Sequence, residues 1–151
     1  MPLPTSIELQ IVTPERMLVH EQVDEVEIPG VEGYFGVLPG HTPLLAALSV
    51  GELWYRTGQQ KTYLSIAYGF AEVLPERVTI LAQLAERAED IDVERAEAAR
   101  TRAAERLDKK SDVDYERARI ALSKSLTRLQ VSSRIASGAG PRLKRVRREG
   151  S

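Results

Sequence analysis

Four carboxylates lie close together near the middle of the chain and could in principle act as general acids or bases. They are Glu86, Glu89, Asp90 and Asp92. A pair of carboxylates that cleaves a glycosidic bond also needs a cleft in which the two groups flank the bond. Carboxylates at an exposed helix start more often stabilise the positive end of the helix dipole. We therefore interpret these four side chains as a helix start and not as a catalytic site.

The chain has two histidines, His20 within a strand-like segment and His41 in the turn LPGHTP. Two separated histidines cannot assemble a His-rich metal site or a proton relay. Cys is absent, which excludes disulfides, thiolate metal sites and a cysteine nucleophile. A phosphate-binding loop and a GxSxG motif are also missing, and the glycines of GVEGYFG lack the strand-turn-helix context of a dinucleotide fingerprint. The sequence thus predicts no metal site, no required cofactor and no enzyme.

Charge is distributed unevenly along the 151 residues, whose net charge is -1. Residues 1–85 hold 4 Lys/Arg and 10 Asp/Glu, a charge of -6, whereas residues 86–151 hold 17 and 12, a charge of +5. From Arg117 onward there are 10 basic residues and one acidic residue, Glu149, which leaves a charge of +9. A stretch of this kind should attract an acidic partner.

The basic cluster at the C-terminal end leaves open an alternative, a free-standing module that binds a nucleotide or a nucleic acid. The residues that could neutralise phosphates are Arg142, Lys144, Arg145, Arg147 and Arg148. The cluster has no interleaved aromatic residues and no recognition fold. We therefore favour a solvated tail without a nucleic-acid partner.

Between Ile7 and about Leu84 the chain consists of short β-rich runs separated by turn residues, such as IELQIV, VDEVEI, GELWYRT and VTILAQL. Alternation is clear where Val26 and Ile28 face away from Glu25 and Glu27. The stretch TGQQK has the composition of a hairpin turn. These features predict a β-sandwich of about ten short strands.

After Ala85 the glycines disappear for about fifty residues and the sequence becomes rich in Ala, Glu and Arg, which are strong helix formers. We expect one helix, capped by Asp92, that runs to about Leu107 and a second from about Asp114 to Ile135, with Ser111 as a weak capping signal. Together they form an antiparallel hairpin. The predicted seam is thin: Ala96, Ala99, Ala103 and Leu107 on the first helix and Ala118, Ala121, Leu122, Leu126 and Leu129 on the second.

Because small side chains bury little surface, such a hairpin should be able to detach. The predicted organisation is a β-sandwich over residues 1–88, a helical hairpin over residues 89–135 and a disordered basic tail over residues 136–151. No stretch is long and apolar enough to cross a bilayer, and the N-terminus MPLPTSIELQ lacks the pattern of a signal peptide. We therefore expect a cytoplasmic protein.

Three segments carry a resemblance to a known family. IELQIVTPERMLV, GYFGVLPGHTPLLAAL and GFAEVLPERVTILAQLAERAEDID resemble the opening, the signature loop and the end of the sandwich in epsilon subunits of bacterial F-type ATP synthases. The resemblance extends from about Ile7 to Val131. The tail from Ser132 is longer and more basic than is typical of the family.

The resemblance implies a non-catalytic subunit of the central stalk of the proton-translocating ATP synthase, peripheral to the cytoplasmic face of the plasma membrane. It implies a contact with the c-ring around Glu32, Gly33 and Tyr34 and a contact with the gamma subunit near His41 and Thr42. It also implies that the hairpin can leave the sandwich, extend along gamma and suppress ATP hydrolysis.

In the extended state the hairpin would contact an acidic segment of the catalytic beta subunits. The basic residues that suit this contact are Arg117, Arg119, Lys124 and Arg128, since charge-assisted hydrogen bonds would hold them to carboxylates. The alternative is that these side chains are a solvated helix face.

Some members of the family bind regulatory ATP on the folded hairpin through a motif that stands here as Ile91, Asp92, Arg95 and Ala96, with Glu86 at an accessory position. An Asp that accepts from the adenine amino group and an Arg that supplies positive charge suit a nucleotide. An N-cap followed by an ion-paired turn explains the same residues equally well.

On the second helix the family holds phosphates with two arginines four residues apart, and this chain has Lys124 and Arg128. Lys keeps the charge and loses the planar fork, so phosphate binding should be weaker. ATP would act by binding the folded hairpin better than the extended one.

Overall fold

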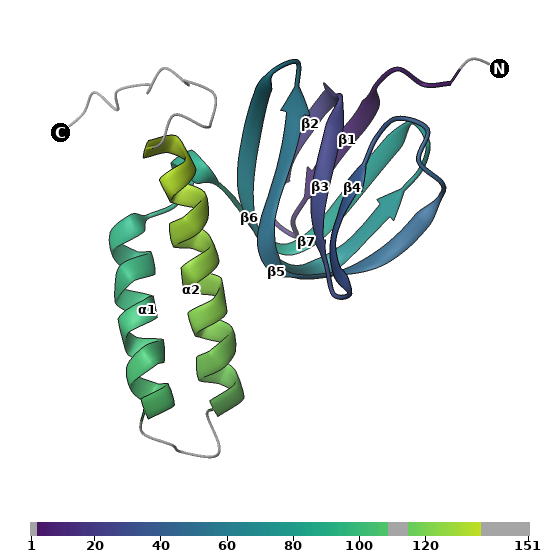
Figure 1. The fold of residues 1–151 in the computed structure, drawn as a ribbon. Coiled ribbons are helices and arrows are strands. Elements are labelled where there is room, and N and C mark those ends of the chain that lie inside the picture. The colour runs from purple at the N-terminus through teal and green to yellow at the C-terminus, as the bar shows by residue number, and fades with distance from the viewer. Residues whose placement is uncertain (1–2, 109–114, 137–151) are drawn as a thin grey trace.

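The chain folds into a strongly curved β-sheet followed by a pair of helices that stand beside it (Figure 1). This architecture is seen in a computed structural model that describes residues 3–108 and 115–136. The predicted tail over residues 136–151 lies outside the described residues except for Ala136, and the proposed capping pair Ser111 and Asp114 lies outside them as well. The curved sheet and the two helices confirm the predicted fold class, a β-sandwich followed by a two-helix hairpin.

Seven strands form the sheet in the part of the chain that the structure describes. Their bounds are β1 Ile7–Val12, β2 Met17–Val23, β3 Glu25–Gly30, β4 Gly33–Val37, β5 Leu44–Thr57, β6 Gln60–Val73 and β7 Arg77–Arg87. The sequence predicted about ten shorter runs. The numbers differ because runs that the sequence suggested as separate, such as KTYLSIAY and FAEVL, continue as one strand of 14 residues, β6. The predicted hairpin turn at TGQQK joins β5 to β6 through paired Thr57 and Gln60.

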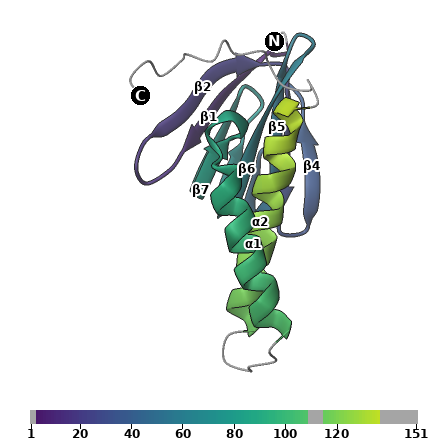
Figure 2. The ribbon, with the colours of Figure 1, turned by 90° about the vertical axis from the view of Figure 1, so that its left-hand side faces the viewer.

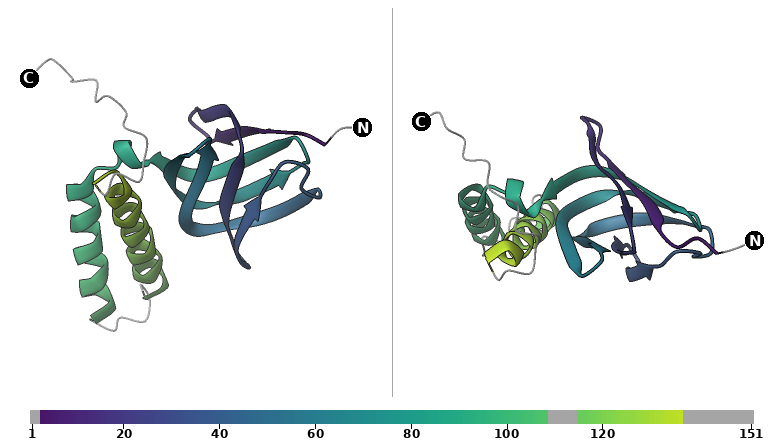
Figure 3. Two further views of the ribbon diagram at one scale, coloured as in Figure 1. Left: turned by 45° about the horizontal axis from the view of Figure 1, so that its top comes forward. Right: turned by 90° about the horizontal axis from the view of Figure 1, so that it is seen from above.

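The order of hydrogen-bonded strands is β2-β1-β7-β6-β5-β3-β4, and β1 and β7 form the parallel pair in this order. The long strands β5 and β6 bend, so the sheet folds over itself into two layers (Figure 3). As a result β2 contacts β5 although the two are far apart in the strand order.

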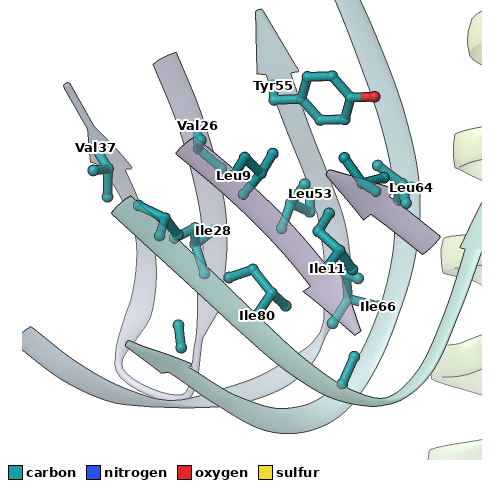
Figure 4. Packing of buried hydrophobic residues seen from close by; sticks show 14 of the residues in the cluster. Leu9, Ile11, Val26, Ile28, Val37, Leu53, Tyr55, Leu64, Ile66 and Ile80 are labelled. Atoms are coloured by element: carbon teal, nitrogen blue, oxygen red, sulfur yellow. The ribbon is translucent and has the colours of Figure 1, made fainter. Parts of the chain in front are cut away.

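Branched aliphatic side chains fill the space between the two layers (Figure 4). The alternation along the strands places one side chain in two inside, as in β1, where Ile7, Leu9 and Ile11 are fully buried. Val26 and Ile28 are also buried while Glu25 and Glu27 are partly exposed, as the alternation predicted. Every residue of this buried cluster lies on one of the strands β1 to β7.

A bend in β6 depends on two consecutive residues with positive φ, Tyr68 at 63° and Gly69 at 126°. A Cβ atom on Gly69 would lie 1.9 Å from the carbonyl oxygen of Leu81 on β7, so this position requires glycine. The bend turns Tyr68 toward the helices, where it contacts Lys124.

The helical part begins with the short 3-10 helix η1 (Ala88–Asp90) and continues with α1 (Val93–Asp108) and α2 (Tyr115–Ala136). The two α-helices run antiparallel and contact each other along their length (Figures 1 and 2). Asp92 caps α1, since its Oδ1 accepts a hydrogen bond from the backbone N–H of Arg95 at 3.1 Å. Leu126, predicted in the seam, is instead 47% exposed, and the neighbouring Ser125 is buried in its place.

Candidate functional site between the hairpin and the sandwich

Helix α2 attaches the hairpin to the sandwich, and α1 packs mainly against α2 (Figure 2). The side of α2 that contacts β5, β6 and η1 carries small or branched residues, of which Ser125 and Val131 are buried. The Ser125 hydroxyl donates to the carbonyl oxygen of Ala121 at 2.8 Å, so its polar atom is satisfied within the helix. Side chains of this size leave space between the helices and the sheet.

A cavity of about 240 Å³ occupies part of this space, between α1, α2 and the strands β6 and β7. Most of its lining consists of small or apolar side chains such as Ala67, Leu84 and Ala99. Of the seven residues predicted to bind ATP, three line this cavity: Glu86, Lys124 and Arg128. The tertiary structure thus brings together the charged residues that the resemblance selected from β7 and α2.

Glu86 and Arg128 form an ion pair across the cavity. Arg128 Nη2 donates a hydrogen bond to Glu86 Oε2 at 3.2 Å, and Arg128 Nε lies 2.7 Å from Glu86 Oε1. The buried Nε–H is not aligned for a hydrogen bond with any described residue, so this second contact is a charge contact only. The predicted phosphate-binding arginine is therefore already neutralised by a carboxylate of the sandwich.

Lys124 contributes the second positive charge of the cavity. Its Nζ lies 5.5 Å from the centre of the Tyr68 ring, within the range of a cation–π contact. Among the described residues it makes no ion pair, so its charge is balanced less completely than that of Arg128.

The other four predicted ATP-binding residues do not line the cavity. Asp92 is exposed and caps α1, and Arg95 is exposed in the first turn of that helix. Ala96 is fully buried, and Ile91 is 7% exposed in a small apolar cluster. The helix-cap interpretation of the motif thus matches the observed geometry of Asp92.

Sequence reasoning missed a second attachment of the hairpin, between Arg134 near the end of α2 and Glu52 on β5. Arg134 Nε donates to Glu52 Oε2 at 3.1 Å, and Arg134 Nη2 donates to Glu52 Oε1 at 3.0 Å. The Glu52 carboxylate raises the pKa of Arg134 above its ordinary value. The single available signal was an acidic residue inside the apolar run of a strand, and nothing in the sequence pointed to its partner.

The predicted beta-subunit contacts on the first turns of α2 lie on its exposed side. Arg117 and Arg119 are both exposed, and Arg119 Nη2 contacts Glu116 Oε2 at 3.0 Å on the same helix. Lys124 and Arg128, predicted for the same contact, instead face the cavity in this folded arrangement.

The residues predicted to contact the c-ring lie in the turn between β3 and β4 and at the start of β4. Val31 and Glu32 are exposed at the tip, and Gly33 has φ 126°. Tyr34 is 57% exposed, yet its hydroxyl accepts a hydrogen bond from the backbone N–H of Glu52 at 3.1 Å. A Cβ on Gly51 would lie 2.5 Å from that hydroxyl, so glycine permits the close approach.

The residues predicted to contact gamma lie in the loop before β5. His41 Nδ1 lies 2.6 Å from the carbonyl oxygen of Thr42, and Thr42 is exposed. The neighbouring Gly40 donates from its backbone N–H to the carbonyl oxygen of Pro75 at 2.7 Å, which ties the loop to the start of β7. His41 therefore has the geometry of a turn residue.

Three observations bear on other kinds of site. Within residues 3–108 and 115–136 no three His, Asp or Glu side chains gather as a metal site would require, and no helix is long and apolar enough to cross a membrane. A cleft of about 460 Å³ lies elsewhere, beside Glu21, Tyr55 and Arg87, and contains no predicted site residue.

Comparison with protein families separates the same two parts of the chain. Residues 6–88 match the family described as ATP synthase, delta/epsilon chain, beta-sandwich domain, and residues 89–133 match the family described as ATP synthase, delta/epsilon chain, long alpha-helix domain. The chain belongs to the ATP synthase epsilon-chain family. It is accordingly a non-catalytic subunit of the central stalk in the F1 part of ATP synthase.

Curated relatives are identical to this chain at about half of the aligned positions. The ATP synthase epsilon chain of Koribacter versatilis is 51% identical over 102 residues, which is 68% of this chain and 72% of the relative. That of Syntrophobacter fumaroxidans is 58% identical over 101 residues, 67% of this chain and 75% of the relative.

Solved structures with the same fold come from ATP synthase assemblies. A chain in the Euglena gracilis mitochondrial ATP synthase, solved as OSCP/F1/c-ring, aligns with a TM-score of 0.74 and 25% identity over 91% of this epsilon chain and 84% of its own length. A chain from the central stalk and c-ring of the Tetrahymena thermophila mitochondrial ATP synthase aligns with a TM-score of 0.51 and 11% identity, over 89% of this chain and 98% of its own length. This likeness shows the fold alone.

Proposed function

We propose that this epsilon chain couples the catalytic core to the c-ring and restrains ATP hydrolysis when its helical hairpin leaves the sandwich. The observation that carries the proposal is the way the hairpin is attached. A small apolar contact around Val131 and two ion pairs, Glu86–Arg128 and Glu52–Arg134, hold it against the sheet. An attachment of this kind can open without disturbing the core of the sandwich.

A contact with gamma is supported by an exposed apolar strip on the sandwich. Ala47 on β5 pairs with Phe70 on β6, and Phe70 pairs with Leu81 on β7, so the three side chains lie on one face. Phe70 is 56% exposed and Leu81 54% exposed, and Leu45, farther along the same face, is 72% exposed. Contiguous exposed apolar side chains favour a protein interface, and this strip begins close to the predicted loop at His41 and Thr42.

A contact with the c-ring is supported by the exposed turn between β3 and β4. Val31 is 61% exposed at its tip next to Glu32, and Tyr34 extends the exposed surface. Such a subunit would be peripheral to the membrane, on the cytoplasmic side of a bacterial plasma membrane, in a complex whose coupling ion we take to be the proton.

An inhibitory contact with beta subunits is supported by the charge of α2. In the folded arrangement Arg128 is neutralised by Glu86. When the hairpin extends, Arg128 and Lys124 would leave the cavity and join the exposed Arg117 and Arg119 in a contact with an acidic segment of a partner.

Binding of regulatory ATP to the folded hairpin is supported by two positive charges that line the cavity, Lys124 and Arg128. At about 240 Å³ the cavity is smaller than the roughly 300–1,000 Å³ of typical ligand pockets. ATP would therefore have to displace Glu86 from Arg128 and extend toward Arg95. We expect weak affinity that stabilises the folded hairpin.

The experiment that tests this function measures ATP hydrolysis by the alpha-beta-gamma core with added full-length chain or a chain that ends at Asp90. We expect both chains to bind gamma, only the full-length chain to inhibit, and high ATP to relieve the inhibition. Arg117→Gln should weaken inhibition, because Arg117 is exposed on α2 and belongs to neither of the two ion pairs that hold the hairpin down. Arg100→Gln should not, because Arg100 pairs with Glu97 on α1. Equal inhibition by both chains, or inhibition by neither while both bind gamma, would contradict the regulatory role.

A further inference from the structure

The Glu52 carboxylate is nearly buried although it lies on the outer side of the sandwich, beside the hairpin. Glu52 is 8% exposed, and both of its oxygens accept hydrogen bonds from the guanidinium group of Arg134. This two-point arrangement is the strong form of an arginine–carboxylate pair. The Arg134 side chain retains 37% exposure, so the carboxylate is the more deeply buried partner.

Aromatic and apolar side chains surround this ion pair. The Arg134 guanidinium carbon lies 5.1 Å from the centre of the Tyr63 ring. Val131, three residues earlier on the same face of α2, is fully buried in a cluster with Tyr63 and Ile91. Trp54 packs against that cluster from β5, two residues beyond Glu52 and thus on the same side of the strand. The end of α2 is therefore anchored by one ion pair set in a small apolar contact.

This anchor is separate from the cavity that contains Glu86, Lys124 and Arg128. Neither Glu52 nor Arg134 lines that cavity, and neither belongs to the predicted ATP-binding motif. An attachment at this position can hold the hairpin whether or not a ligand occupies the cavity.

We infer that Glu52 is the docking site for Arg134. This pair determines the fraction of molecules whose hairpin is docked on the sandwich in the absence of nucleotide. The inference rests on the proposed function, in which the hairpin leaves the sandwich. While α2 is docked, Glu52 depends on Arg134 to compensate its burial. When α2 leaves, both groups regain water. Removing one partner therefore destabilises the docked state, because the other charge is left without its partner. Removing both partners should destabilise it by less than the sum of the two single removals.

The test compares the full chain with the variants Glu52→Gln, Arg134→Gln and the double variant. Trp54 is the only tryptophan of the chain, so its fluorescence reports on the cluster, and amide hydrogen exchange along α2 reports on docking. We expect Arg134→Gln to reduce the ratio of docked to undocked hairpin at least ten-fold. We expect the double variant to lose clearly less than the sum of the single variants.

The matched controls are Glu97→Gln and Arg100→Gln, which remove the same charges from an exposed pair within α1, 2.7 Å apart. They should leave docking unchanged. Arg134 is on the hairpin, so its variant keeps the test valid even if Glu52→Gln disturbs the folding of β5. The inference would be overturned if Arg134→Gln left the hairpin as fully docked as the control variants do. It would also be overturned if the loss of docking in the double variant equalled the sum of the losses in the two single variants.

The same variants distinguish the failure of this inference from failure of the proposed function. If docking shifts and inhibition of the alpha-beta-gamma core does not, the docking pair stands and the regulatory role of the hairpin fails. If docking is unchanged while full-length chain still inhibits and the chain ending at Asp90 does not, the regulatory role stands and the pair has no part in it.

Discussion

The sandwich and the hairpin are stabilised by different interactions. The sandwich encloses a continuous cluster of large aliphatic side chains, most of them fully buried. The hairpin buries alanines between its helices, and it reaches the sandwich through Val131, a few small residues and two ion pairs. Because apolar burial stabilises by roughly 25 cal/mol per Å², the sandwich gains far more from its core than the hairpin gains from its seam.

This difference suits the separate roles that we propose for the two parts. A part that must transmit torque needs a rigid core, whereas a part that responds to a ligand needs two arrangements of similar free energy. Charge pairs between the two parts suit the second requirement, since each charge regains water when the pair opens.

The largest effect should follow from a cavity in the sandwich core. Ile80 is fully buried on β7, so Ile80→Ala should lower the free energy of unfolding by about 2–5 kcal/mol in urea titrations. The neighbouring Leu81 is 54% exposed, and Leu81→Ala should change the stability of the isolated chain by less than about 0.5 kcal/mol. Similar losses of unfolding free energy in Ile80→Ala and Leu81→Ala would mean that the buried aliphatic core is not what stabilises the sandwich.

A smaller effect should appear at alkaline pH and should also be confined to the sandwich. Burial raises the pKa of Tyr55 from 10.0 to about 12, with a further contribution from the Glu21 carboxylate. Between these values the unfolded chain loses the phenol proton and the folded chain keeps it, so stability should fall as pH rises from about 10 to 12. The loss should approach 2–3 kcal/mol, on the order of 1.4 kcal/mol per unit of pKa.

The comparison for this prediction is Tyr55→Phe, which should remove that part of the pH dependence in urea titrations at pH 9, 10 and 11. Phenolate absorbance of the folded wild-type chain provides a second reading. An unchanged pH dependence in Tyr55→Phe would show that the buried phenol does not destabilise the folded state at alkaline pH.

The smallest effect concerns the start of the hairpin and separates the two interpretations of the motif at Asp92. Asp92→Ala should destabilise α1 by about 1 kcal/mol, seen as lower helicity on heating, whereas Asp92→Asn keeps a capping oxygen and should resemble the wild type. If Asp92 also binds the adenine amino group, titration with ATP should show weaker binding in both variants. Loss of helicity in Asp92→Asn as well would count against the cap.

Much of the fold could be predicted from local patterns. Alternation identified the buried side of β3, and composition located the change from strands to helices after Ala85. The strand count could not be predicted, because strands that bend between two layers, such as β6, contain glycine and small residues that look like turns in the sequence. Leu126 was misplaced because helical periodicity leaves the orientation of a thin stripe uncertain by one residue.

The sequence by itself determined the family, the two kinds of structure and the cap at Asp92, because each depends on residues that are near one another along the chain. Only the tertiary structure decided which charges meet. Arg128 reaches Glu86 across 42 positions, and Arg134 reaches Glu52 across 82. Both pairs depend on how α2 lies on the sheet, and no periodicity in the sequence encodes that contact.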